Sequence, residues 1–362
     1  MKRVLIQGYD IIPHKDGTYI AGIGRSNIEL FKALQDIEGT GIDFSIYCTG
    51  KESIGFKCYN WDINYHSFPF PNHISNYRTS LESWYRRYVV GYDLLHITNN
   101  VGNMKWDKDF VVTMHDMYRL DNSDWDRKHF KECGERSRGI VTCSAFSKND
   151  IVDKLNVDPS KISVIPWGVS HTLFHPRTEN DVESLKKKYK IKDQYFFACS
   201  CSNPRKNGDI IADATKKIHQ NNVSVVLAWR NPPQYILDKC AKEIEERRLV
   251  FLDYLSDEEL AILYSGAIAS IFVSSFEGFG FPIVESMACG TPCITCKNSS
   301  LEEIGGDKAI YVKERDSDNL AEVLLSLINN GCNNEADLIA YADKFTWQKT
   351  AAEYVKFYKK YL

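Results

Sequence analysis

The stretch Phe276-Glu277-Gly278-Phe279-Gly280-Phe281-Pro282-Ile283-Val284-Glu285 decides how the second half of the chain is interpreted. It follows a short apolar run, residues 269–274, which is typical of a buried strand. Pro282 suits the start of a helix, where its missing N–H leaves no hydrogen bond unmade. The sequence therefore predicts a strand, a glycine-rich loop and a helix, with Glu277 before the helix and Glu285 inside its first turn.

This arrangement is suited to an anionic or polyhydroxyl ligand. The start of a helix presents free N–H groups and partial positive charge. The amides of Phe279, Gly280 and Phe281 can donate to hydroxyl or phosphate oxygens, and a carboxylate can accept from both hydroxyls of a diol. Acidic residues near a helix start also occur without any ligand, because they complement the helix dipole. From the residues alone, both interpretations stay open.

The run from Glu277 to Pro292 resembles the E-x7-E motif of retaining glycosyltransferases of family 4, whose usual text is E-G-F-G-x-P-x-x-E-x-M-A-x-G-x-P. The resemblance implies an α/β chain with the GT-B fold, in which two Rossmann-like, doubly wound parallel-sheet domains face a central cleft. It also implies that Glu277 lies beside the donor sugar, and that Glu285 holds the ribose hydroxyls of the nucleotide.

Length and composition agree with a soluble, two-domain protein. A chain of 362 residues can bury two cores, and a formal net charge of −3 disfavours a general nucleic-acid binder. We find no apolar run of the length that spans a membrane, and Met1 is followed directly by a predicted strand rather than by a signal peptide. We therefore expect a cytoplasmic protein, without nucleic acid as a partner.

The cysteines are numerous, eleven in all, and we expect most of them to be small buried apolar residues. Cys289, Cys293 and Cys296 lie close together and raise the alternative of a metal site. No histidine or fourth cysteine lies nearby to complete a four-ligand zinc site, so we favour packing.

Strands and helices alternate along the whole chain, which predicts parallel sheets covered on both faces. The polar stretch 174–181 is interpreted as a linker. We expect an acceptor-side domain of residues 1–175, completed by a C-terminal crossing helix at 346–362, and a donor-binding domain of residues 176–345. Among the expected elements are helices at 27–34, 79–89, 208–220, 233–246 and 282–288, and strands at 223–228, 249–252, 268–274 and 293–296.

Gly22 and Gly24 precede the first predicted helix and would let the backbone approach a ligand. The spacing differs from the dinucleotide-binding pattern, because Asn27 stands where a third glycine is required, and this disfavours a dehydrogenase. The family usually has G-G-I-G-R here, and this chain has Ala21 in place of the first glycine. The resemblance implies that Gly22 and Gly24 lie close to the donor diphosphate.

His115 follows a predicted strand and is followed by Asp116, which can cap the next segment. A single histidine at a strand end often has only a structural role. The family carries a histidine at this place that faces the donor sugar, so the resemblance implies a catalytic role for His115.

Arg205 and Lys206 end the first strand of the second half and open a predicted helix, where two cations oppose the helix dipole. A bound diphosphate would relieve this conflict, and the family's R-K pair does so. The chain departs from the family at 198–202 and at 228–230, where glycines are usual. In the family the loop that corresponds to 251–260 passes the nucleotide base, so Leu255 is a further candidate contact.

The reaction implied is transfer of a hexose-type sugar from a UDP- or GDP-linked donor to a glycan, lipid-linked or other acceptor, with retention at the anomeric carbon. Arg205 and Lys206 would stabilise the leaving diphosphate, and Glu277 the positive charge that develops on the sugar. Because these side-chain cations would make a metal unnecessary, we expect no metal and no cofactor. The alternative is a non-catalytic nucleotide-sugar binder or scaffold of the same fold.

The segment from Tyr77 to Tyr88 is aromatic and basic. It could touch a membrane surface that carries a lipid-linked acceptor. The alternative, which we favour, is an ordinary helix whose arginine side chains extend along its surface toward water.

Overall fold

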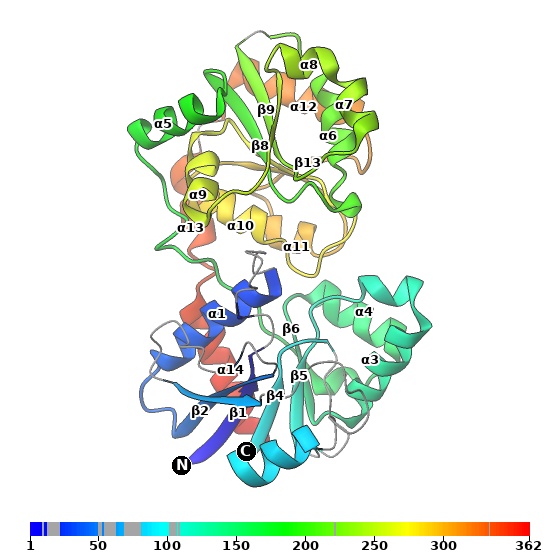
Figure 1. Ribbon diagram of the computed structural model, residues 1–362, viewed down its shortest axis with the longest axis vertical. Helices are drawn as coiled ribbons and strands as arrows, with labels where there is room; N and C mark the ends of the chain where they lie inside the picture. The colour runs from blue at the N-terminus through cyan, green and yellow to red at the C-terminus, as the bar shows by residue number, and fades with distance from the viewer. Residues whose placement is uncertain are drawn as a thin grey trace. The chain divides into compact units, whose positions relative to one another are not determined.

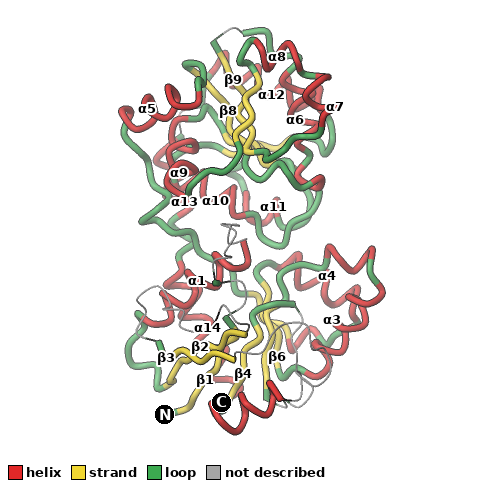
Figure 2. Tube along the Cα trace, in the orientation of Figure 1, coloured by secondary structure: helices red, strands yellow, loops and turns green. Residues whose placement is uncertain are grey.

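The computed structural model describes residues 1–8, 11–12, 22–49, 53, 63–68, 81–100, 107, 109–220, 222–332 and 334–362. The chain divides into two compact units (Figure 1). The N-terminal unit contains Met1–Gly168 together with Trp347–Leu362, and the C-terminal unit contains Val169–Thr346. Figure 2 shows that each unit has strands at its centre and helices around them. Ala21 and the Tyr77–Arg78 end of the aromatic segment lie outside the described residues.

The N-terminal unit is built on a parallel sheet. Within the described residues its strands follow the order β3-β2-β1-β4-β5-β6-β7. Helix α1 packs against α14, and α3 packs against α4, so two helix pairs flank the sheet (Figure 1). The elements are β1 (Lys2–Gln7), α1 (Gly22–Gln35), β2 (Ile42–Thr49), β3 (Asn64–Phe68), the π-helix η2 (Tyr85–Val90), β4 (Leu94–Ile97), β5 (Phe110–Thr113), the 3-10 helix η3 (Tyr118–Asn122), α3 (Asp124–Arg136), β6 (Gly139–Thr142), α4 (Ala145–Leu155), the 3-10 helix η4 (Pro159–Lys161), β7 (Ile162–Val164) and α14 (Trp347–Tyr361).

The C-terminal unit repeats this architecture with the strand order β10-β9-β8-β11-β12-β13, again parallel throughout the described residues. Its elements are α5 (Glu179–Tyr189), β8 (Gln194–Ala198), the 3-10 helix η5 (Pro204–Lys206), α6 (Gly208–Thr215), β9 (Val223–Ala228), α7 (Gln234–Lys239), α8 (Ala241–Glu245), β10 (Leu249–Leu252), α9 (Asp257–Gly266), β11 (Ser270–Phe272), α10 (Phe281–Ala288), β12 (Cys293–Cys296), α11 (Leu301–Gly305), β13 (Ile310–Val312), α12 (Ser317–Asn330) and α13 (Glu335–Ala342).

Both sheets are doubly wound, and each has a point at which the strand order reverses. In the N-terminal unit this switch point lies between β1 and β4, and in the C-terminal unit it lies between β8 and β11. Ligands of open parallel sheets bind at the carboxyl ends of the strands that flank such a point. The loops that follow β1, β4, β8 and β11 are therefore the places to look for a site.

The cores consist of apolar strand residues covered by helices. Strands β4, β5, β6 and β12 are buried along their whole length, as expected for parallel strands with helices on both faces. Phe110 and Ile140 belong to the core of the N-terminal unit, and Phe196 and Ile294 belong to the core of the C-terminal unit. Each unit thus has a hydrophobic core of its own.

Helix α14 is fastened to the N-terminal sheet by a buried polar network. Nδ1 of His96 lies 2.7 Å from the hydroxyl of Tyr358, and Nε2 lies 2.8 Å from Oγ1 of Thr113. The hydroxyl of Tyr354 lies 3.2 Å from the same threonine oxygen. Burial lowers the pKa of His96 to about 3, so its imidazole is neutral at physiological pH. The C-terminal helix is therefore part of the N-terminal unit in packing as well as in hydrogen bonding.

Several boundaries differ from those predicted. Helix α1 begins at Gly22 rather than at residue 27, and the helix predicted at 233–246 is interrupted at Cys240. Strand β3, helix α11 and helix α5 were not predicted, and α5 starts inside the stretch interpreted as a linker. β3 is an edge strand in which only Phe68 is buried, so it carries no apolar run.

Nine of the cysteines that the structure describes are buried and free, and Cys332 is exposed and free. The prediction that most cysteines are packing residues is confirmed for these residues. Burial raises the pKa of the Cys293 and Cys296 thiols to about 12, which keeps them protonated.

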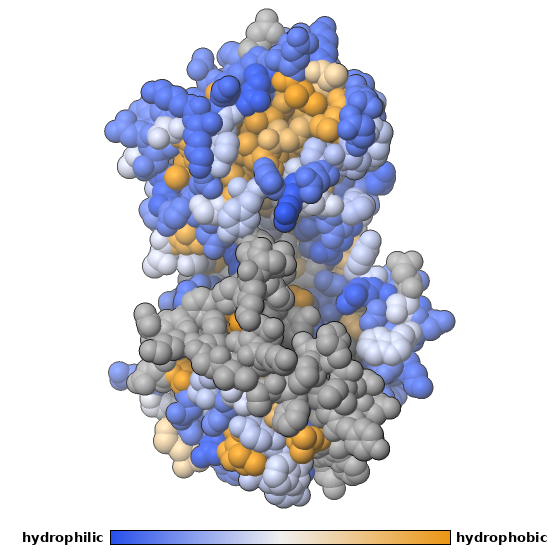
Figure 3. Space-filling view, in the orientation of Figure 1, coloured by the Kyte–Doolittle hydropathy of each residue, from blue (hydrophilic) through white to orange (hydrophobic). Residues whose placement is uncertain are grey.

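The described surface in Figure 3 is mostly hydrophilic, with an apolar area over β8, β9 and α6 of the C-terminal unit. No helix in the described ranges is both long and apolar enough to span a membrane.

Candidate active site

Two loops flank the switch point of the C-terminal sheet and bring opposite charges together. Residues 204–206 follow β8, and the loop with Glu277 follows β11. Nζ of Lys206 lies 2.5 Å from Oε1 of Glu277, and an Nη atom of Arg205 lies 3.5 Å from Oε2. All three side chains are largely buried, with exposed fractions of 10–18%. The structure therefore joins three predicted site residues into one charged cluster.

Backbone contacts fix the two loops to each other. The guanidinium of Arg205 donates to the carbonyl of Phe276 at 3.0 Å, and the amide of Ser275 donates to the carbonyl of Arg205 at 2.8 Å. The side-chain amide of Asn207 donates to the carbonyl of Val273 at 2.8 Å. The ammonium of Lys206 also lies 4.4 Å from the centre of the Phe272 ring. The cluster is thus preorganised by contacts that do not depend on a ligand.

One argument drawn from the sequence needs correction here. Arg205 and Lys206 do not open an α-helix: they lie in the 3-10 turn η5, and α6 begins at Gly208. Their charges are balanced by Glu277, so a bound anion is not required to explain them. The charge of the pair suits a diphosphate, but the predicted conflict with a helix dipole is not evidence that a diphosphate binds here.

Ser299 and Ser300 support the glutamate loop, and sequence analysis missed both. Oγ of Ser299 accepts a hydrogen bond from the amide of Glu277 at 3.1 Å. The hydroxyl of Ser300, which is fully buried, lies 2.9 Å from the carbonyl of Glu277 and 2.8 Å from that of Phe279. Ser299 has a left-handed backbone with φ 45°, a strained conformation that often accompanies functional loops. No local pattern indicates these contacts.

The glycine-rich loop ends in a turn that only glycine accommodates well. Gly280 has φ 107°, and a Cβ at this position would lie 3.0 Å from a methyl group of Leu301. Helix α10 begins at the next residue, Phe281, whose ring packs edge-on against that of the buried Phe279 at 5.2 Å. The predicted order of strand, glycine loop and helix is therefore confirmed.

Glu285 lies deeper in α10 than predicted. It is the fifth residue of the helix, and the first turn contains no acidic residue. The carboxylate is buried, and the hydroxyl of Tyr264 donates a hydrogen bond to it at 3.4 Å. The same hydroxyl lies 3.3 Å from Sγ of Cys199. A buried glutamate of this kind cannot be explained as a partner of the helix dipole, because that effect is confined to the first turn.

Leu255 precedes α9 at the carboxyl end of β10 and is buried. Ser256 and Glu259 form the predicted capping box, in which each side chain bonds the backbone of the other residue. Although burial opposes it, hydrogen bonds from Lys188 and from the Ser256 backbone lower the pKa of Glu259 to about 2. The cap fixes the loop on which Leu255 lies.

His115 is a neutral, buried imidazole beyond the end of β5 in the N-terminal unit. Its Nε2–H donates to the carbonyl of Thr98 at 2.8 Å, and its amide donates to Oδ1 of Asn100 at 2.6 Å. This assignment leaves Nδ1 as an acceptor, and Nδ1 is buried without a hydrogen-bond partner among the residues that the structure describes. Burial is the main cause that lowers the pKa of His115. The ring of Trp167 lies 5.1 Å away. The site thus contains an unused acceptor suited to a hydroxyl group.

Gly22 and Gly24 occupy the first turn of α1 instead of a loop before it. A Cβ on Gly22 would meet no atom within 4 Å, and Gly24 is buried. The sequence prediction of their loop conformation is therefore wrong, while their place after β1, at the switch point of the N-terminal sheet, agrees with a ligand-facing helix start.

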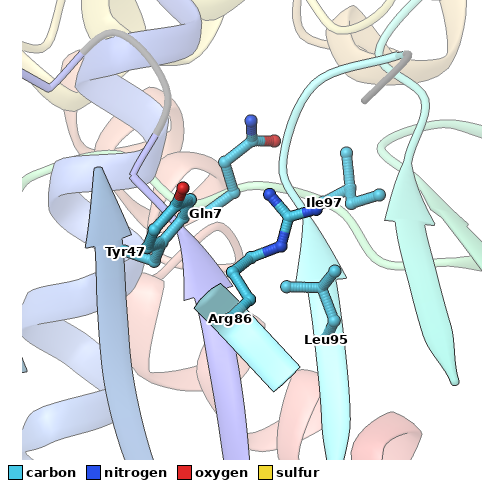
Figure 4. A pocket seen from close by; sticks show the side chains of 5 residues that line it. All are labelled: Gln7, Tyr47, Arg86, Leu95 and Ile97. Atoms are coloured by element: carbon cyan, nitrogen blue, oxygen red, sulfur yellow. The ribbon is translucent and has the colours of Figure 1, made fainter. Parts of the chain in front are cut away.

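A small cavity with both polar and apolar walls lies beside this switch point (Figure 4). Gln7, Tyr47 and Ile97, which line it, come from the carboxyl halves of three neighbouring strands, and Arg86 reaches it from η2. Within the described part of the chain, Oε1 of Gln7 and the hydroxyl of Tyr47 are buried there without a hydrogen-bond partner. Burial, with a contribution from a nearby carboxylate, raises the pKa of Tyr47, so its phenol stays protonated.

Arg86 contradicts the favoured interpretation of the aromatic segment. Its side chain does not extend toward water but is 3% exposed, with Nη atoms 2.6 Å from Glu82 and 2.5 Å from Asp107.

No group of three or more potential ligands among the described residues is arranged to hold a metal ion.

Two doubly wound parallel sheets are the architecture of GT-B glycosyltransferases, and two glycosyltransferase family models match this chain. Residues 181–345 match the family model for glycosyl transferases group 1, and residues 20–173 match the model for glycosyltransferase family 4. The chain belongs to glycosyltransferase family 4.

Several of the relatives with assigned functions are mannosyltransferases, and others include a probable sucrose-phosphate synthase. O-antigen chain mannosyltransferase B of Escherichia coli is 26% identical over 268 residues, which cover 69% of this chain and 70% of that protein. O-antigen chain mannosyltransferase RfbU of Salmonella typhimurium is 28% identical over 323 residues, which cover 83% of this chain and 85% of that protein.

Solved structures show the same fold at low identity. The structure of Anabaena HepE in complex with UDP-glucose superposes with a TM-score of 0.78 at 16% identity, and all of both chains is covered. Sucrose-phosphate synthase from Thermosynechococcus elongatus superposes with a TM-score of 0.73, at 15% identity and over 99% of both chains.

Proposed function

We propose that this protein is a retaining hexosyltransferase that transfers mannose from a nucleotide diphosphate sugar, GDP- or UDP-linked, to a hydroxyl group of a glycan or lipid-linked glycan. The observation that carries the proposal is the charged cluster of Arg205, Lys206 and Glu277 at the switch point of the C-terminal sheet. The choice of mannose rests on the names of the relatives from Escherichia coli and Salmonella typhimurium.

In this proposal the two cations bind the donor diphosphate. Negative charge accumulates on the diphosphate as the glycosidic bond breaks, and preorganised cations stabilise that charge in the transition state. Arg205 can donate two parallel hydrogen bonds, whereas Lys206 acts as a point charge. Because side chains supply the positive charge, we propose that no metal ion takes part.

Glu277 would stabilise the positive charge that develops at the anomeric carbon, as carboxylates do in glycosidases. The leaving phosphate oxygen would act as the base that takes the acceptor proton on the same face of the sugar, which gives retention. His115 would accept a hydrogen bond from a hydroxyl of the donor sugar through Nδ1, for which the described residues offer no hydrogen-bond partner.

The remaining contacts would hold the nucleotide. Glu285 would bind the ribose hydroxyls, and Leu255 would lie beside the base. The amides of Phe279, Gly280 and Phe281 would donate to the donor sugar. Gly22 and Gly24, in the first turn of α1, would let the backbone approach the diphosphate.

We further propose that the protein is cytoplasmic and touches a membrane through the segment 81–90. This segment has its polar side inward: Glu82 and Arg86 are each 3% exposed. Its outward residues include Leu81, Trp84, Tyr88 and Val89, with exposed fractions of 43–70%, and Arg87 is exposed among them. Tryptophan and tyrosine are the residues preferred at membrane interfaces. An acceptor with a lipid anchor would be presented at such a surface.

The proposed activity is tested by incubating the purified protein with GDP-mannose, UDP-mannose, UDP-glucose and ADP-glucose in the presence of EDTA, and measuring nucleotide release and donor-dependent thermal stabilisation. The proposal expects release from a mannose donor without added metal. Binding without release, even with mannose oligosaccharides present, would favour the non-catalytic binder. A requirement for Mg²⁺ or Mn²⁺ would contradict metal independence.

A further inference from the structure

The first turn of α3 lies at the same edge of the N-terminal sheet as His115. In a parallel sheet the helix that follows a strand starts at the carboxyl edge and runs back across the sheet. Helix α3 follows β5 through η3, and Trp125 is its second residue. The amide of Tyr118 donates to Oδ1 of Asp116 at 3.1 Å, and the guanidinium of Arg127 donates to the carbonyl of Leu120 at 3.0 Å. The segment from His115 to α3 is therefore tied together.

Trp125 has a larger exposed fraction than the other tryptophans that the structure describes. Its exposed fraction is 61%, whereas Trp167, Trp229 and Trp347 are at most 7% exposed. Among the tryptophans that the structure describes, Trp84 is the other exposed one, and it belongs to the apolar surface of the segment 81–90. Tryptophan is enriched at binding interfaces, because its ring is apolar and its N–H can donate a hydrogen bond.

The indole is held rigidly by His129, one helical turn further along. The two rings are stacked, with centroids 3.8 Å apart and planes at 24°. Nδ1–H of His129 donates to the carbonyl of Trp125 at 2.7 Å, which fixes the imidazole in this position. Because His129 covers one face of the indole and most of the side chain is still exposed, the opposite face is open to solvent.

Polar side chains are also present on His129 and on residues near Trp125 in the sequence. The hydrogen bond from Nδ1 leaves Nε2 of His129 available for a further hydrogen bond. The guanidinium of Arg119, whose side chain is 74% exposed, lies 3.9 Å from Asp126. A flat aromatic face with donors and acceptors at its rim matches a pyranose ring, which has C–H bonds on its faces and hydroxyl groups around its edge. A lipid surface would instead require apolar neighbours.

We propose that Trp125 and His129 form a stacking site for a sugar ring of the glycan acceptor. The proposal rests on the proposed transferase function and adds the chemical class of the acceptor: a saccharide recognised by its ring face in the N-terminal unit. Trp125 does not touch the reacting atoms in this account, and its contribution is to acceptor affinity.

A binding experiment tests the site without reference to catalysis. The protein is labelled with fluorotryptophan, and the ¹⁹F resonance of Trp125 is assigned by its absence from W125F. Mannotriose, maltotriose and galactobiose are titrated in turn. We expect the Trp125 resonance to shift with at least one saccharide while that of Trp84 stays in place. An unmoved Trp125 resonance with all three saccharides, or equal shifts of both tryptophans, would overturn the proposal.

A kinetic experiment with the same saccharides tests its role in the reaction. W125A should raise the acceptor KM roughly tenfold, the size expected for loss of one aromatic contact of about 1.4 kcal/mol. Donor KM and donor hydrolysis should stay unchanged, and W125F, which keeps a flat ring, should retain most of the affinity. Equal acceptor KM values for wild type and W125A would refute the site. If the Trp125 resonance shifts with saccharide but the protein turns over no donor, the saccharide site is supported and the transferase function is refuted.

Discussion

The ammonium of Lys206 lies 2.5 Å from the carboxylate of Glu277, although 71 positions separate the two residues in the sequence. Arg205 approaches the second carboxylate oxygen at 3.5 Å. Without a ligand, the proposed diphosphate-binding cations and the proposed catalytic carboxylate thus neutralise one another. A diphosphate that binds here must share these cations with Glu277.

This relationship predicts opposite effects of one substitution on binding and on catalysis. E277Q removes the negative charge that competes for Lys206 and Arg205, so a nucleoside diphosphate should bind more tightly, by roughly threefold to tenfold, equivalent to about 1 kcal/mol. Transfer should fall by about 100-fold or more, because the developing positive charge loses its partner. Calorimetric titration and single-turnover kinetics measure the two effects.

The matched control for E277Q is E302Q, which changes a glutamate with a 60% exposed side chain in the same unit. E302Q should alter neither quantity. Weaker diphosphate binding by E277Q would mean that Glu277 does not compete with the ligand for these cations.

Tyr264 should act as a positioning residue for Glu285. Y264F removes a hydroxyl that lies 3.4 Å from the Glu285 carboxylate, with little change in side-chain volume. Loss of a hydrogen bond of about 1 kcal/mol predicts a donor KM about fivefold higher with kcat retained. Steady-state kinetics measure both, with Y235F, a change at an exposed tyrosine, as the control. An unchanged donor KM would show that the hydroxyl has no part in holding the nucleotide.

The exposed face of the segment 81–90 should be required for membrane contact. The double variant W84A/Y88A removes two side chains that are 52% and 70% exposed, so folding should be little affected. Co-sedimentation with vesicles that contain anionic phospholipid should fall strongly, while donor hydrolysis in solution stays the same. The experiment counts against membrane contact if wild-type protein does not sediment with the vesicles.

Buried histidine should make the N-terminal unit sensitive to acid. The pKa of His96 is about 3 in the folded protein against 6.5 when exposed, so between these values the unfolded state binds more protons. Stability contributed by neutral His96 is present above pH 6.5 and is lost as the pH falls, by about 2 kcal/mol at pH 5. Urea unfolding of the N-terminal unit at pH 7 and pH 5 should show this extra loss for wild type and not for H96Q. Equal losses of unfolding free energy in wild type and H96Q would contradict the low pKa of His96 in the folded protein.

The regular parts of the fold could be predicted because buried strands consist of short runs of apolar residues. Strands β9, β10 and β12 have the predicted bounds, since each is a short apolar run between turn residues. The start of α1 was missed because glycines usually indicate a loop. Edge strand β3, with its sequence Asn-Tyr-His-Ser-Phe, lacks the periodicity of a buried strand.

The candidate site was predictable only in its residue types. The glycines, cations and carboxylates were found from local motifs, but contacts across the fold were not. No pattern near Lys206 indicates that Glu277 is its partner, nor does any pattern near Glu277 point to Ser299 and Ser300. The burial of Arg86 could not be predicted for the same reason: its partner Asp107 lies outside the helix that contains Arg86.

The stereochemistry of donor hydrolysis tests the central claim most directly, because it needs no knowledge of the acceptor. GDP-α-mannose is incubated with the protein and EDTA, and proton NMR identifies the mannose anomer that forms first, before mutarotation. The account predicts early α-mannose and a rate that falls sharply in E277Q. Early β-mannose would contradict retention, and no turnover of any mannose donor, with or without metal and saccharide acceptors, would contradict the proposed transferase.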